Sequence, residues 1–160
     1  MNTGELLNLS LVLHIVGLAT VGGSNLVAFV MQGQSWKQYA EDKGKGIAIM
    51  TATSKVARIT MIGFLVLVLS GISMMVITQG VFGMQFWFRI KMIILLIIII
   101  LGVTLGRRDT SKLGKLMMED NDGKDVAAKL RSTRSRVRIF YIVQLSLLMV
   151  IFVLSVFKFN

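Results

Sequence analysis

The chain has a single histidine, His14, and it falls inside a long apolar stretch, about 13 Å along the helix axis from where that stretch begins. An imidazole surrounded by hydrocarbon needs a polar partner, so such a side chain normally faces the interior of a helical bundle. Two interpretations remain open from the chemistry alone. Either His14 hydrogen-bonds a serine or a backbone carbonyl of a neighbouring helix, or it ligates a metal. Because the chain has no cysteine, haem iron is the first metal to consider.

Arg89 and Lys91 form the second unusual feature, because both follow the aromatic segment 86–88 at the start of another apolar stretch. Anchoring at the membrane surface accounts readily for Arg89. Lys91 lies further into the apolar run, where it is positioned to meet an anionic group held between helices, such as a porphyrin propionate or a lipid phosphate. Counted inward from the outer ends of their stretches, His14 and Lys91 lie at comparable depth. A ligand that contacts both would occupy the outer half of a membrane.

Small residues lie on one face of each of the first two apolar stretches. Such residues let another helix, or a flat macrocycle, approach the backbone closely, and both interpretations stay open. A polar amide, Asn25, lies deeper in the first stretch and is expected to hydrogen-bond a neighbouring helix or its own symmetry mate. The small residues concerned are Gly17, Ser24 and Ala28 in the first stretch, and Ser70, Gly71 and Ser73 in the second.

The composition requires lipid as the solvent for these stretches. Of 160 residues, 54% are hydrophobic and only 16% are charged, with a mean hydropathy of +0.74, whereas soluble domains carry about 25% charged residues. Four stretches each supply the ~20 apolar residues needed to cross ~30 Å of hydrocarbon. We therefore predict an all-α fold, an integral membrane four-helix bundle forming one transmembrane domain over residues 1–160. The expected spans are 5–31, 59–78, 86–105 and 137–157.

The distribution of basic residues sets the expected orientation. Fifteen of the eighteen lysines and arginines fall between spans one and two or between spans three and four. The positive-inside rule then predicts two long basic cytoplasmic loops, with the N- and C-termini outside, in the inner (cytoplasmic) membrane of a cell. A turn signal at 120–123 separates two amphipathic arms, which predicts a cytoplasmic helical hairpin over 107–136.

Several other ligands fit the sequence poorly. The formal net charge of +10 lies beside the spans and has no aromatic-lined surface, so no nucleic-acid partner is expected. The acidic turn at 120–123 lacks the first ligand and the closing glutamate of a calcium loop. The eleven methionines are scattered instead of forming clusters on one face, which leaves copper(I) as a minor alternative.

The segment Leu13-His14-Ile15-Val16-Gly17, followed by Gly22-Gly23, resembles the first helix of a group of small bacterial membrane proteins. This group includes the HemJ-type protoporphyrinogen oxidases and the CopD-like copper-resistance domains. The segment 86–92 is similar to the group's aromatic-rich helix entry that ends in a lysine. Ser70-Gly71-Ile72 resembles the Thr-Gly-Leu often found in the helix between. The resemblance covers roughly residues 10–106.

The resemblance implies a helical bundle that binds haem or a related porphyrin, with His14 and Lys91 as the functional pair. The chain departs from the HemJ-type pattern in three ways. It has no arginine late in the first helix, where residues 27–31 are apolar, no further histidine after it, and no tryptophan before the small pair. These departures weigh more against porphyrinogen oxidation than against haem binding.

The expected function is therefore that of a membrane protein binding haem b or a related porphyrin, with a redox or electron-transfer role. If the protein is an enzyme, it is a haem- or porphyrin-linked oxidoreductase. One histidine per chain leaves either five-coordinate iron or a homodimer in which two chains ligate one haem. The alternatives are a small cofactor-free transporter or channel subunit, and a regulatory protein whose basic hairpin binds lipid head groups. The predicted cofactor-binding residues are His14, which is also the metal ligand, Gly17, Arg89 and Lys91.

Overall fold

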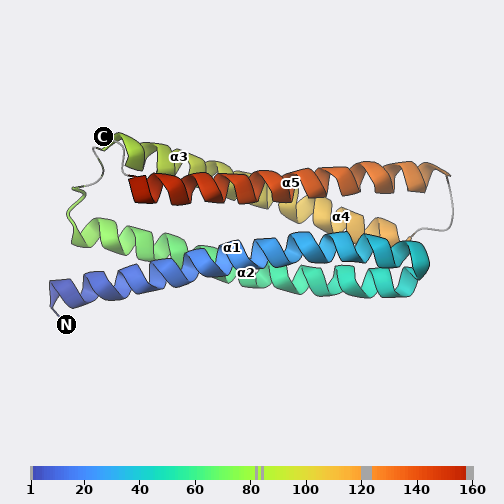
Figure 1. Cartoon of the computed structure of the whole chain (residues 1–160), viewed down its shortest axis with the longest axis horizontal. Helices are drawn as coiled ribbons and strands as arrows, with labels where there is room; N and C mark the ends of the chain where they lie inside the picture. Colours follow the sequence, from blue (N-terminus) through green and yellow to red (C-terminus); the bar gives the residue numbers. More distant parts are fainter. Residues whose placement is uncertain (1, 82, 84, 120–123, 158–160) are drawn as a thin grey trace.

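The computed structural model describes residues 2–81, 83, 85–119 and 124–157. In chain order its elements are α1 (Thr3–Glu41), α2 (Lys43–Ile77), α3 (Phe86–Leu101), the π-helical segment η1 (Gly102–Gly106), α4 (Arg107–Met118) and α5 (Lys124–Phe157). The helices run along one another in an elongated bundle (Figure 1). The start of α1 and the end of α5 lie at one end of this bundle, and the α1–α2 turn lies at the other.

Within the described residues, four helices are long and apolar enough to cross a membrane: Thr3–Glu41, Lys43–Ile77, Phe86–Met118 and Val126–Phe157. The third combines α3, η1 and α4 in one continuous helix. Many leucine, isoleucine and valine side chains of these helices are exposed on the surface of the chain. An apolar surface of this extent is typical of helices that face lipid. The all-α prediction and the presence of helices of membrane-spanning length are confirmed.

The long basic loops of the prediction are helical in the structure. At 1.5 Å per residue, α1 and α2 each extend for roughly 50–60 Å, nearly twice the ~30 Å of a hydrocarbon layer. A hydropathy pattern marks only the lipid-crossing part of such a helix, so the predicted spans end well inside the helices, which continue through the basic segments. The two arms of the expected hairpin over 107–136 are helical, as α4 and the start of α5. Its turn at 120–123 lies outside the described residues.

A single residue, Asp42, separates α1 from α2. Its backbone is extended, with φ −148° and ψ 108°, and its side chain accepts a hydrogen bond from the Lys45 amide at 3.2 Å, which caps α2. Just beyond the turn, the Ser35 hydroxyl donates to the Gly46 carbonyl at 2.8 Å. This tight reversal aligns α1 against α2 in an antiparallel pair.

The buried apolar residues form two clusters along the bundle. α5 packs against α1, α3 and α4, and α4 also packs against α2. The cluster toward the α1–α2 turn comprises Ala28, Tyr39, Met50, Leu113, Met117, Leu130, Val137 and Tyr141. The cluster toward the chain ends is smaller and comprises Val21, Ile98, Leu148 and Ile151. The basic extensions therefore belong to the packed bundle.

Candidate cofactor site

His14 is half-buried on α1 and faces α2. Its Nδ1 atom lies 3.0 Å from the Ser70 hydroxyl oxygen. Ser70 donates its own hydrogen to the Val66 carbonyl at 2.7 Å, so towards His14 it acts as the acceptor. Nδ1 therefore carries the imidazole hydrogen, and Nε2 keeps its lone pair. The His14 ring also lies within hydrogen-bonding reach of the Leu67 backbone.

The α2 backbone approaches His14 closely because residue 71 is glycine. A Cβ atom on Gly71 would lie 3.4 Å from the Cε1 atom of His14, so the ring is in van der Waals contact with this face of α2. One helical turn toward the chain ends, the Ser10 and Ser73 hydroxyls lie 2.9 Å apart. The face of small residues predicted for the second span thus packs against α1 and hydrogen-bonds to it.

Gly17 lies one turn further along α1 and is covered by α2. A Cβ atom at this position would lie 2.9 Å from the Leu67 amide nitrogen and 3.1 Å from the Gly63 carbonyl oxygen. Ser24 and Ala28 are buried as well, and the Thr60 hydroxyl donates to Ser24 at 2.8 Å. Of the two interpretations of this small-residue face, the structure supports helix–helix packing.

Lys91 lies on α3, and its ammonium group donates a hydrogen bond to the Ser155 hydroxyl at 2.9 Å. Ser155 donates its own hydrogen to the Ile151 carbonyl at 2.7 Å, so it repeats the arrangement of Ser70. Among the described residues, no carboxylate forms a salt bridge with Lys91. Lys91 and His14 thus each contact a serine hydroxyl within the apolar part of the bundle.

The Arg89 side chain contacts the segment that precedes α3. This side chain is exposed, and its Nε donates to the Gly83 carbonyl at 3.4 Å. Trp87 on the same helix is buried, and its indole NH donates to the Gln85 side chain at 2.6 Å. These contacts fix the entry to α3. Of the two predicted cations, Lys91 hydrogen-bonds to another helix of the bundle.

Two buried amides form a further polar feature that the sequence indicated only in part. Asn25 is 4% exposed and Gln144 is 2% exposed. In the part of the chain that the structure describes, the Asn25 Nδ2 atom and the Gln144 Oε1 atom have no hydrogen-bond partner. The bond expected from the Asn25 amide to another helix is therefore not made by Nδ2. Gln144 was missed, although it is the only amide in the charge-free run 139–157.

Replacing Gln144 by methionine is expected to raise the free energy of unfolding by about 1 kcal/mol, because a buried acceptor without a partner costs about 1–3 kcal/mol. Methionine has a similar length and no amide. Unfolding in mixed detergent micelles, followed by circular dichroism, measures the change. Ser35→Ala is the control of opposite sign, since it removes a hydrogen bond that is made. A loss of stability in Gln144→Met would show that the amide is hydrogen-bonded in the protein.

Among the described residues, no group of three or more His, Cys, Asp or Glu side chains is arranged to hold a metal ion. A metal at His14 would therefore have to bring most of its ligands with it, as the iron of a porphyrin does. Comparison of the chain with protein-family models, curated proteins and solved structures finds no match. The interpretation of the site depends on its own geometry and on the sequence resemblance described above.

Proposed function

We propose that this chain is a multi-pass protein of the inner membrane that binds haem b or a related porphyrin, with the Nε2 atom of His14 as the axial ligand of the iron. The hydrogen bond between His14 Nδ1 and Ser70 is the observation that carries the proposal. Metal-ligating histidines almost always donate their other ring NH to a fixed acceptor, which sets the tautomer and the ring orientation. A purely structural histidine can make the same bond, so the distinguishing property is the availability of Nε2.

Lys91 supports the same proposal from a second helix. Its ammonium has a neutral serine as hydrogen-bond partner. A porphyrin propionate is an anion of suitable reach, and pairing with it would compensate the charge of Lys91 inside the apolar layer. When bound, the haem would supply one-electron redox chemistry. The protein would ligate the iron, orient the ring and exclude water.

We favour an arrangement in which His14 of a single chain would hold the haem. The homodimer alternative needs two copies of His14 at one iron, with close packing through the small-residue face of α1. Gly17, Ser24 and Ala28 on that face are buried within their own chain. A dimer would have to use a different surface. Held by His14 of one chain, the haem would supply small-ligand binding or redox chemistry.

The proposed orientation follows the charge. The stretches 6–36, 59–77, 92–106 and 139–157 contain no charged residue, and the basic residues lie mostly beyond one end of them. Under the positive-inside rule, the end of the bundle with the α1–α2 turn faces the cytoplasm and both chain termini lie outside. His14 and Lys91 then lie in the outer half of the membrane.

The test is an oxidised-minus-reduced absorption spectrum of the purified protein, recorded for wild type, His14→Ala and Ser10→Ala. We expect a Soret band and reducible visible bands in wild type and in Ser10→Ala, which breaks a hydrogen bond one turn away. His14→Ala should lose these bands. Ser70→Ala should keep them with haem affinity reduced by about tenfold to a hundredfold, as expected for loss of a group that orients a metal ligand.

A wild-type protein that stays colourless after haem is added would overturn the proposal. His14 would then be a packing residue. A cofactor-free transporter or channel subunit would remain, together with a lipid-binding regulatory role, and both need tests that do not depend on colour.

A further inference from the structure

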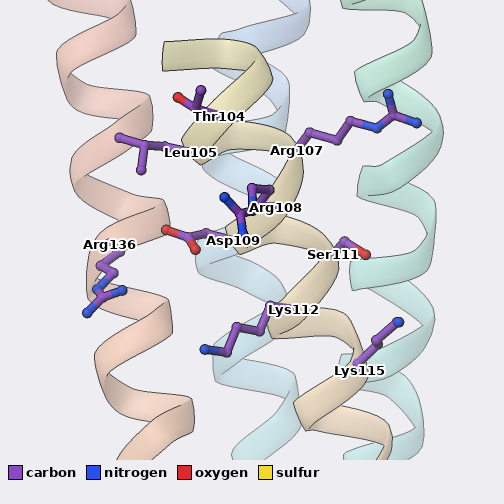
Figure 2. A pocket seen from close by; sticks show the side chains of 9 residues that line it. All are labelled: Thr104, Leu105, Arg107, Arg108, Asp109, Ser111, Lys112, Lys115 and Arg136. Carbon is purple, nitrogen blue, oxygen red and sulfur yellow. The ribbon is translucent and has the colours of Figure 1, made fainter. Parts of the chain in front are cut away.

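A cationic pocket lies where the apolar part of the third long helix ends. It has a volume of about 760 Å³ and runs along the first turns of α4. Figure 2 shows Asp109 and Lys112 extending from α4 toward α5, which carries Arg136, whereas Arg107 and Lys115 extend toward α2. The lining residues are Thr104, Leu105, Arg107, Arg108, Asp109, Ser111, Lys112, Lys115 and Arg136.

The charges that line this pocket are unbalanced. Five of the lining residues are cations, and Asp109 is the one carboxylate among them. Among the described residues, none of these five cations forms a salt bridge, with Asp109 or with any other carboxylate. Three of the five are arginines, whose planar guanidinium groups bind phosphate oxygens in pairs. The unbalanced charge and the share of arginines favour a phosphate-bearing anion.

An apolar groove adjoins the pocket and shares Leu105, Asp109 and Arg136 with it. The groove has a volume of about 190 Å³, and it continues from the cations along the apolar stretches of the two helices. Gly106 allows Phe140 to form part of this wall, because a Cβ atom there would lie 2.5 Å from the ring carbon Cζ. The groove is otherwise lined by Leu101, Ile139 and Val143.

The pocket and the groove together lie at the boundary between lipid and water. Thr104 and Leu105 are near the end of the charge-free run 92–106, and the first basic residue of the pocket, Arg107, follows directly. In a membrane of ordinary thickness this is the depth of the phosphate groups, with acyl chains on the apolar side. A soluble anion would need the pocket but not the groove.

We propose that this pocket binds the phosphate of an anionic phospholipid, whose acyl chain lies in the groove between η1 and α5. The proposal uses the membrane orientation given above but not haem binding. His14 lies in the outer half of the apolar layer and the pocket at its cytoplasmic boundary, so lipid binding and the haem spectrum report on separate sites. The bound lipid would hold α4 against α5 and fix the basic end of the bundle at the membrane surface.

Lipid affinity is measured by native mass spectrometry of the full chain in detergent, titrated with phosphatidylglycerol or phosphatidylcholine. Wild type is expected to prefer phosphatidylglycerol by at least about tenfold, since each basic residue near an anionic lipid surface changes affinity by roughly fivefold. The variant Arg107→Gln/Arg108→Gln/Arg136→Gln should lose this preference.

The control variant removes the same number of positive charges, three, from other positions at the basic end of the bundle. Lys37→Gln, Lys55→Gln and Arg58→Gln combined are expected to keep the preference, because these exposed residues of α1 and α2 do not line the pocket. Equal losses in the two triple variants would show diffuse attraction and would overturn the proposal. The circular dichroism spectrum and thermal unfolding of each variant should match wild type, which shows that the variants fold.

The groove is tested with Val143→Trp, which fills it from a partly exposed position, and with Ile139→Trp as a second variant. Both are expected to lower phosphatidylglycerol affinity by about tenfold with every cation still in place. Inorganic phosphate in excess should not displace the lipid from wild type. Displacement by phosphate, together with unchanged affinity in both groove variants, would assign the pocket to a soluble phosphate and overturn the lipid assignment.

Discussion

The substitution Gly46→Ala is expected to lower the free energy of unfolding by about 3 kcal/mol, which is the upper end of what overpacking usually costs. Gly46 lies in the first turn of α2 and is buried against α1. A Cβ atom there would lie 2.5 Å from the Tyr39 Cβ, 2.6 Å from its Cα and 2.8 Å from its backbone nitrogen. These are mostly backbone atoms of a helix, so relief requires α1 and α2 to separate near Asp42. The Ser35 bond to the Gly46 carbonyl would be lost in the process.

The matched control is Gly33→Ala on α1, where an added Cβ atom meets nothing within 4 Å. Glycine inside a helix costs roughly 0.5–1 kcal/mol relative to alanine, so this variant should be slightly more stable than wild type. Thermal unfolding in detergent, followed by circular dichroism, compares the two. If Gly46→Ala unfolded at the wild-type temperature, the close approach of α1 and α2 at this turn would be incorrect.

This contrast shows which parts of the fold the sequence could predict. The charge-free runs located every helix of membrane-spanning length, because transfer to lipid dominates the energetics of such segments. The polar extensions carry a weaker signal, which over 107–136 is the recurrence of apolar residues at helical spacing and over 32–58 is less distinct. Residues 32–58 contain lysines, glycines and an aspartate, which are as typical of a loop as of a helical hairpin. What makes them helical is packing at positions such as Gly46 and Ser35, and that packing depends on how α1 and α2 align.

The unknown alignment of the helices also limited what the sequence could predict about the candidate site. The sequence predicted that His14 would meet either a serine or a metal, and that Lys91 lies at a similar depth. It did not identify Ser70 as the partner, because the alignment of α1 with α2 is set by contacts such as Gly17 against Leu67. Haem binding stays a prediction. The cationic pocket could not be predicted from the sequence for a different reason. Two helices form it, because Arg107 lies on α4 and Arg136 on α5.

Lys91→Met is expected to change stability and haem affinity in opposite directions. A lysine at the centre of a membrane helix costs about 2.5–3.5 kcal/mol, and the cost is smaller toward the end, where Lys91 lies. Its described hydrogen-bond partner, Ser155, is neutral. Methionine keeps the length of the side chain and removes the charge. The haem-free protein should therefore gain about 1–2 kcal/mol in free energy of unfolding.

If Lys91 pairs with a porphyrin propionate, the same substitution removes a charge-assisted hydrogen bond worth about 1.5–3 kcal/mol. Haem affinity, measured by spectral titration of the haem-free protein, should then fall by about tenfold, while the Soret band of the saturated protein stays in place because His14 still ligates the iron. Lys37→Met, at an exposed position of α1, should change neither quantity. A gain in stability with unchanged haem affinity would separate Lys91 from the cofactor. A loss of stability would mean that its charge is compensated within the haem-free protein, which would remove the electrostatic argument for an anionic ligand beside His14.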